Sequence, residues 1–373
     1  MDSRKLISGH QLRYYIALSA PPTRAPVDGT EAFIRPEAGF NPSWFHKYCG
    51  VDFSRRWHED PEYRLHCHHL MSNEVRRRFP ARDIGGVNNS QPPDLLTGVY
   101  GSAVVPVIFG QSIKYFDDKW PAPHGKPLTD AQADSLSPPD LENNPFFQAI
   151  LQQLDKIEQL TGTARGYLNW QGTLNTAFRL RGEKMFTDLI DNPQRAHHIF
   201  HCVAATMING IKKLHQRQRK AGVDDKFATI SNCVVNMIGP RYYEKHVLPF
   251  DLKIRAEFEN FGIHNCAWTV DPYMEAYATV PKLGYIDMGL ASDFEKARRL
   301  FPDTRRTLLY TSMDLANRAK DQISRDLERV AKELAPCDLG LPDIEADVPD
   351  ERILFAMDLC EKLSEKYGEN RDE

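Results

Sequence analysis

The chain has 373 residues, with 47 Lys and Arg against 51 Asp and Glu, which gives a formal net charge of -4. This balance argues against nucleic acid as a partner, because nucleic-acid binders usually carry a clustered excess of basic residues. Hydrophobic residues make up 41% and charged residues 26%, as in an ordinary globular protein. No apolar run is long enough to cross a membrane, and the first residues lack the apolar core of a signal peptide. We therefore expect a cytoplasmic protein that does not act at a membrane.

The seven cysteines do not fit a disulfide framework, because their number is odd and they are scattered over a long chain. We expect them to be thiols, some of which can bind a metal ion.

Residues 1–144 are irregular and rich in proline and aromatic residues, with two Pro-containing polar stretches at 21–26 and 120–125. Proline at this density blocks long helices and favours loops. This part is predicted to form a cap of short helices and loops that includes the first barrel elements. Within it, 55–78 is predicted to be helical, and the apolar run 104–109 is predicted to be a strand.

Residues 145–373 alternate between strand-like and helix-like segments. The predicted strands are 166–170, 229–235, 264–268, 284–289, 306–311 and 337–341, each separated from the next by a helical pattern. Such a series indicates parallel strands with helical crossovers. Because no Gly-rich phosphate turn is present, we predict an α/β fold closed as a (β/α)₈ TIM barrel, of which 145–373 is the main part.

His264 and Cys266 stand on alternate residues, so on a strand both side chains leave the same face. Cys337 is a third soft ligand beside the last predicted strand. Two thiolates and one imidazole suit Zn²⁺ and leave a position open for substrate or water. Asp287, Asp338 and Glu345 are alternatives for a fourth ligand, and Asp287 is also predicted to be catalytic. A His-x-Cys pair alone in a core strand more often reflects packing than metal binding, so the prediction depends on the third ligand and on the barrel context.

Several polar and aromatic residues follow other predicted strands, where barrel enzymes bind substrate. The predicted substrate-binding residues are Asn169, Trp170, Asn232, Asn236 and Tyr310. Gln171 is a further candidate for the pocket lining, and packing or turn roles remain an alternative for Asn169, Trp170 and Gln171. In the cap, Trp44, His46, Tyr48, Trp57 and His58 either line a pocket for an aromatic substrate or anchor the cap to the barrel. The run 66–69 is a weak candidate for a second metal site, because adjacent helical positions point in different directions.

The segment Ile263-His264-Asn265-Cys266 after Phe261-Gly262, Asp287 on the next strand, and Leu334-Ala335-Pro336-Cys337-Asp338 resemble the uroporphyrinogen decarboxylase superfamily. Within it, they are most similar to the zinc-dependent methyltransferases of corrinoid systems, including the methylcobalamin:coenzyme M type. The resemblance covers about residues 145–367. It implies a zinc site at His264, Cys266 and Cys337 on a barrel.

The chain also departs from this family. The Arg-Gln-Ala-Gly segment that holds substrate carboxylates in the decarboxylases has no counterpart here, and Asn232 stands where an acidic residue is common. The chain also lacks an Asp-x-His-x-x-Gly corrinoid signature, so any cobalamin is expected on a separate corrinoid protein that docks over the barrel mouth.

The resemblance and the enlarged aromatic cap lead us to expect methyl transfer from a small O-methyl donor, such as a methoxyaromatic, to the cobalt of that partner. Three alternatives stay open: methyl transfer from methylcobalamin to a thiol, a metal-free decarboxylase, and a non-catalytic corrinoid-binding barrel. A homodimer is also left open.

Overall fold

The computed structural model describes residue 16, residues 32–86 and residues 91–368. The Pro-rich stretch 21–26 lies outside the described residues. Within them, no helix combines the length and the apolar character needed to cross a membrane.

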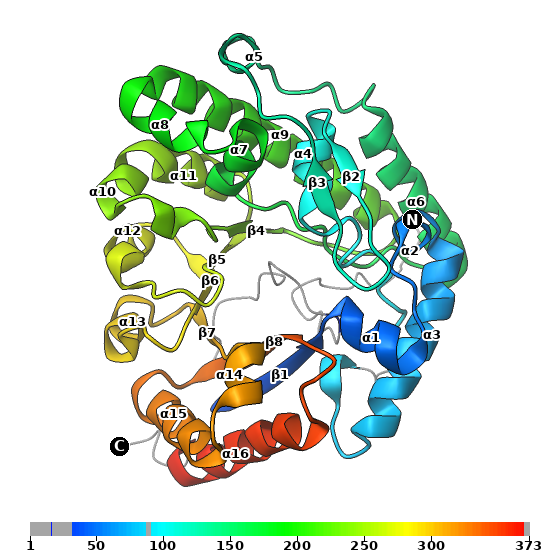
Figure 1. The fold of residues 1–373 in the computed structure, drawn as a ribbon, viewed down its shortest axis with the longest axis vertical. Coiled ribbons are helices and arrows are strands. Elements are labelled where there is room, and N and C mark those ends of the chain that lie inside the picture. The colour runs from blue at the N-terminus through cyan, green and yellow to red at the C-terminus, as the bar shows by residue number, and fades with distance from the viewer. Residues whose placement is uncertain (1–15, 17–31, 87–90, 369–373) are drawn as a thin grey trace.

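Six parallel strands form the central sheet, in the order β1-β8-β7-β6-β5-β4 (Figure 1). Strands β4, β6 and β7 are buried along their whole length, as expected for a parallel sheet covered on both faces. The strands are β1 (Ile34–Phe40), β4 (Phe227–Ser231), β5 (Asn260–His264), β6 (Leu283–Met288), β7 (Arg305–Leu309) and β8 (Cys337–Ile344).

Helices form the outer layer around this sheet (Figure 1). They are α6 (Pro145–Thr161), α7 (Thr173–Arg181), α8 (Lys184–Asp191), α9 (Pro193–Lys220), α10 (Pro240–Tyr242), α11 (Leu248–Ala256), α12 (Met274–Ala278), α13 (Phe294–Leu300), α14 (Ser312–Asn317), α15 (Lys320–Glu333) and α16 (Asp350–Gly368), with a π-helix, η5 (Tyr243–Val247), before α11. Helix α6 begins and ends at the capping residues that the sequence indicates. Asn144 accepts a hydrogen bond from the Phe147 amide, and Gly162 ends the helix in the left-handed region.

The N-terminal part contributes β1 to the central sheet, where it pairs in parallel with β8. Its other elements are α1 (Pro42–Cys49), α2 (Arg55–Glu59), α3 (Pro61–Arg78), α4 (Val104–Ile108), α5 (Asp130–Asp134) and a small hairpin of β2 (Ser112–Lys114) and β3 (Ala122–His124). Trp44 and Trp57 are buried and pack against neighbouring aromatic rings, so they anchor this region.

Two predicted strands are wrong. Residues 104–108 form the helix α4, which tolerates Pro106 because the third amide of a helix has no intrahelical acceptor. Residues 166–170 run beside β4 without a regular ladder, with Gly166 at a φ of 126°. The Tyr167 hydroxyl instead bridges the backbone of Thr229.

The expected closed eight-stranded barrel is therefore not observed. Among the described residues, six parallel strands are regular, and no regular strand joins β4 to β1. The fold is mixed α/β with a parallel sheet and helical crossovers.

Candidate metal centre

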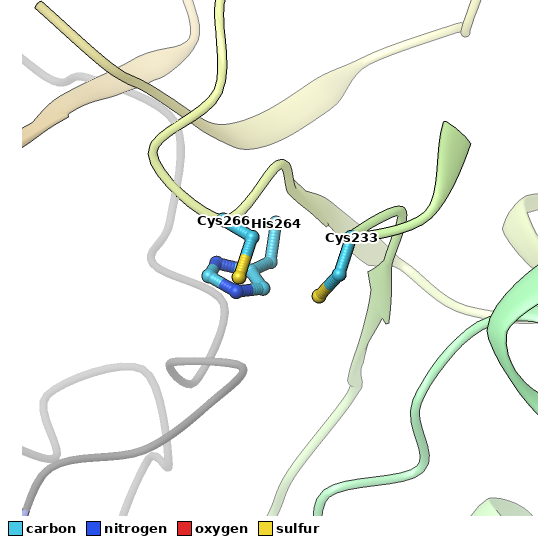
Figure 2. A group of neighbouring side chains, drawn as sticks. All are labelled: Cys233, His264 and Cys266. Carbon is cyan, nitrogen blue, oxygen red and sulfur yellow. The ribbon is translucent and has the colours of Figure 1, made fainter. Parts of the chain in front are cut away.

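Three side chains meet at the carboxyl ends of β4 and β5: Cys233, His264 and Cys266 (Figure 2). Their possible ligand atoms, two sulfurs and a ring nitrogen, all lie within 4.8 Å of one another. In the part of the chain that the structure describes, no other group of three His, Cys, Asp or Glu residues has this arrangement. The run 66–69 therefore does not form a second such group.

Strand register brings the two thiols together. Ser231 of β4 is the parallel partner of His264 of β5, and each cysteine lies two residues beyond a member of this pair. The sequence pattern predicted that Cys266 lies on the same strand as His264. In the structure, His264 is the last residue of β5, and Cys266 lies in the turn that follows.

The turn after β5 has an unusual backbone. Cys266 and Ala267 both have a φ of 60°, in the left-handed region that L-residues adopt rarely. This turn packs against Gly289, whose amide donates to the Trp268 carbonyl at 3.0 Å. A Cβ atom at Gly289 would lie 1.9 Å from the Ala267 oxygen. Glycine is thus required there, and the close packing holds Cys266 over the strand end.

Asp287 of β6 fixes the orientation of His264. Its Oδ2 lies 2.7 Å from His264 Nδ1, and its Oδ1 accepts from the Asn265 amide at 2.6 Å. Because the carboxylate accepts, Nδ1 carries the proton, and Nε2 faces the two thiols. Nε2 is buried and has no hydrogen-bond partner among the described residues. Burial lowers the pKa of His264, but the charge and hydrogen bond of Asp287 outweigh it and raise that pKa to about 10.

These features fit a metal ion. A buried ring nitrogen without a partner costs free energy unless a proton or a cation occupies it. A carboxylate on the far nitrogen is the usual support of a metal-bound histidine. Asp287 was predicted to be catalytic; the structure places it behind His264 as a positioning residue.

The two thiols differ in their environment. A hydrogen bond from Cys266 lowers the pKa of Cys233, against the effect of burial. The same bond, together with burial, raises the pKa of Cys266. Cys233 is thus the more acidic of the two thiols, and two sulfurs with an imidazole are a donor set that suits Zn²⁺.

Cys337 does not belong to this group, which corrects the predicted ligand set. Cys337 is the first residue of β8, so it lies at the amino end of the parallel sheet. Cys233 and His264 lie at the carboxyl ends of β4 and β5, on the opposite edge. The Cys337 side chain is buried near Cys360 of α16, and burial raises the pKa of its thiol to about 12. Cys233 takes the place that the sequence had assigned to Cys337.

The predicted alternatives for a fourth ligand are also engaged elsewhere. Asp338 forms ion pairs with Arg35 and Arg305. Glu345 accepts hydrogen bonds from Asn41 and Ser43.

A cavity of about 260 Å³ opens beside the two thiols. Its lining combines the two cysteines with small, aromatic and amide-bearing residues: Gly98, Gly101, Ser102, Trp120, Asn169, Gln171, Asn175, Phe178, Arg179, Cys233, Val234 and Cys266. Asn169 is thus in the cavity wall, as the substrate-binding prediction requires. This volume lies just below the usual range of about 300–1,000 Å³ for small-molecule sites.

The other predicted substrate-binding residues lie outside this lining. Trp170 packs against Gly210 of α9, where a Cβ atom would lie 2.5 Å from its ring. The Tyr310 hydroxyl donates to Asp326 of α15, in the helical layer. Asn236 is exposed in a short 3₁₀ turn. Asn232 is buried and bonds to Tyr277 and Asp251.

Sequence reasoning missed Cys233 and Asn175, whereas Gln171, a candidate for the pocket lining, does lie in the cavity wall. Cys233 was placed inside a predicted strand, although its distance of two residues from the strand end matches that of Cys266. Gln171 has a φ of 56°, and a Cβ atom at the next residue, Gly172, would lie 2.3 Å from the Ser231 oxygen. This strained turn directs the glutamine amide into the cavity. The Gln171-Gly172 pair was the feature of the sequence that could have indicated such a turn.

No family model and no curated protein sequence matches the chain. Among solved structures, a methyltransferase from Methanosarcina mazei superposes with a TM-score of 0.64 at 14% identity, over 90% of this chain and 95% of that one. The two proteins share a fold. A provisionally named vitamin-B12-independent methionine synthase from Listeria monocytogenes gives a TM-score of 0.42 at 12% identity, over 86% of this chain and 97% of that one.

Proposed function

We propose that the protein is a zinc-dependent methyltransferase that moves a methyl group from a small O-methyl donor to the cobalt of a separate corrinoid protein. The observation that carries the proposal is the group of Cys233, His264 and Cys266 beside a small cavity, where His264 Nε2 is buried and finds no hydrogen-bond partner in the described part of the chain. The fold shared with a methyltransferase supports the same reading.

Cys233, His264 and Cys266 would hold the zinc ion, and Asp287 would keep the His264 ring in the binding orientation. Zinc at this place would act as a Lewis acid toward the heteroatom that carries the methyl group. Trp120 and Phe178 in the cavity wall provide flat apolar surfaces, which favours a methoxyaromatic donor.

In the proposed transfer, the methyl carbon–oxygen bond of the donor breaks and leaves its electron pair on oxygen. The methyl group bonds to Co(I) of the partner, which supplies the new electron pair. The donor oxygen then takes up a proton from solvent and leaves as an alcohol or phenol. The residues of this chain bind and orient the donor, and the cavity walls limit the access of water.

The rim near the site suits a protein partner. Three large apolar side chains are exposed in segments that follow strand ends: Met237 after β4, Trp268 after β5 and Met313 after β7. Exposed apolar groups that gather at one end of a sheet are typical of a docking surface.

The purified zinc-loaded protein, mixed with a Co(I) corrinoid protein and a panel of methoxyaromatics, tests the function. We expect methylcobalamin to form with at least one donor, seen by its absorbance, together with the free phenol. Methylation of cobalt by none of the donors would contradict the proposal, and turnover of a thiol with methylcobalamin would show the opposite direction of transfer.

A further inference from the structure

We propose that Arg179, with the amide of Gln171, binds a carboxylate of the substrate, so that the donor is a small methoxylated acid and not a neutral ether. This inference rests on the proposed function for the methyl group, but the carboxylate subsite has its own evidence. It is carried by the hydrogen-bonding state of two side chains in the cavity wall.

Arg179 is an exposed cation for which the described residues supply no counter-charge. It lines the cavity from α7, and no ion pair or side-chain hydrogen bond involves its guanidinium within the described part of the chain. Arg181, two residues later in the same helix, bonds instead to Asp188 and Asp130. The chain therefore supplies carboxylates to the arginine that faces away from the cavity, and none to the one that faces it.

Gln171 presents a directed donor in the wall of the same cavity. Its side chain is only 4% exposed. Its Oε1 accepts from Asn175 at 3.3 Å, and its Nε2 donates to Asn169 Oδ1 at 3.0 Å. These two bonds fix the amide and use one of its two N–H groups. The second N–H has no acceptor within the described residues and belongs to a group that lines the cavity.

Asn175 links this donor to the candidate metal centre. Its Oδ1 accepts from the Val234 amide at 3.2 Å, and its side chain also hydrogen-bonds to Cys233 and so lowers the pKa of that thiol. A shift of the Asn175 side chain would therefore alter its hydrogen bonds to both Gln171 and Cys233.

The residue types of the whole lining favour an anionic ligand with a flat body. The twelve residues of the lining include no Asp or Glu, and a bound divalent cation would neutralise the charge of the two cysteines. The carboxyl group of Asp343 lies behind Trp120, and burial raises its pKa, which favours its neutral form. The fork of a guanidinium matches the two oxygens of a carboxylate, and such bonds are stronger than neutral ones. Trp120 and Phe178 suit a flat body between the carboxylate and the methoxy group.

Equilibrium binding to the zinc-loaded protein tests the subsite without any methyl transfer. The probes are the three methoxybenzoates and methoxyacetate, each paired with its neutral amide, and binding is followed by calorimetry. We expect at least one acid to bind at least about tenfold more tightly than its amide. Arg179→Gln should weaken that acid about 10- to 100-fold, as expected for charge-assisted hydrogen bonds, and leave the amide unchanged.

Two further variants sharpen the test. Arg179→Lys keeps the charge but not the fork and should recover part of the affinity. Arg299→Gln removes an exposed arginine of α13 outside the cavity and should change nothing. Equal binding of acids and amides, an Arg179→Gln variant with wild-type affinity for the acid, or no binding of any acid would each overturn the subsite.

These outcomes are distinguishable from failure of the proposed function. Acid binding that depends on Arg179 but is never followed by cobalt methylation supports the subsite and contradicts the function. Methyl transfer from neutral ethers at a rate that Arg179→Gln does not change supports the function and overturns the subsite.

Discussion

Cys233 and Cys266 occupy equivalent positions on two neighbouring parallel strands, each two residues past one member of the Ser231–His264 register pair. Neighbouring strands lie only about 4.8 Å apart, so equal offsets from one register pair bring the side chains together. The candidate metal centre therefore depends on the pairing of β4 with β5.

The first prediction concerns the ligands. Cys233→Ala and Cys266→Ala should each lower zinc affinity by more than the roughly 10- to 100-fold typical of losing a supporting residue. Metal analysis of the purified proteins measures the loss. Cys337→Ala is the matched control, because it removes a buried thiol outside the group, and it should retain stoichiometric zinc. Zinc lost from the control but kept by Cys233→Ala would restore the original ligand set.

Asp287→Asn should weaken zinc binding about 10- to 100-fold, because the charged partner of His264 Nδ1 is lost while the shape of the side chain is kept. In the metal-free protein the pKa of His264 should fall, since the Asp287 charge raises it. Competition with a chelator and NMR titration measure the two effects. Asp326→Asn, which makes the same substitution at the residue that accepts from Tyr310, should affect neither.

Tyr277 joins the two loops that carry the cysteines. Its hydroxyl accepts from Asn232 and donates to Asn265, the residues that directly precede Cys233 and Cys266, both at 3.3 Å. Tyr277→Phe leaves the Asn265 oxygen buried and without this donor, which should cost about 1–3 kcal/mol of stability. If the bridge also sets the spacing of the sulfurs, zinc affinity and the spectrum of Co²⁺ in the site change too. Tyr242→Phe, at an exposed position, is the control.

Trp268→Ser should weaken docking of the corrinoid protein at least about tenfold, because a large exposed aromatic residue at an interface often contributes most of the binding energy. Zinc content and binding of the small donor should not change. Ile190→Ser, at an exposed position of α8, tests whether any loss of apolar surface has the same effect. Equal effects of the two variants on the KM for the corrinoid protein would contradict a specific rim.

Acid should destabilise the fold through buried histidines. Burial and the nearby Arg64 lower the pKa of His58 to about 3, and burial and Arg219 lower that of His215 to about 4. In the unfolded chain both protonate near pH 6.5. Stability should therefore be full above about pH 6.5 and fall as the pH drops toward 4, by up to about 1.4 kcal/mol per pH unit for each group.

His215→Phe tests this directly, because the ring lies beside Phe227 and Phe258 and an apolar ring can replace it. Urea unfolding between pH 7 and pH 4 should show a shallower loss of stability in this variant. An unchanged slope would exclude His215 from the effect.

The sequence by itself determined the class of the fold and two of the three residues of the candidate site. Alternating strand and helix patterns depend on local periodicity, which the chain carries in its own order, and they correctly indicate parallel strands with helical crossovers. His264 and Cys266 are close in sequence, so their proximity needs no tertiary information.

Only the tertiary structure decided which residue supplies the third ligand, where the cavity lies and that Arg179 lines it. Periodicity does not specify the register between strands or the end of a strand at which a residue lies, and for this reason Cys337 was chosen over Cys233. The left-handed turns at Gln171 and Cys266 depend on close packing against Ser231 and Gly289, which are distant in the chain. In the same helix, the fold brings Asp130 and Asp188 to Arg181, and it brings no carboxylate of the described residues to Arg179.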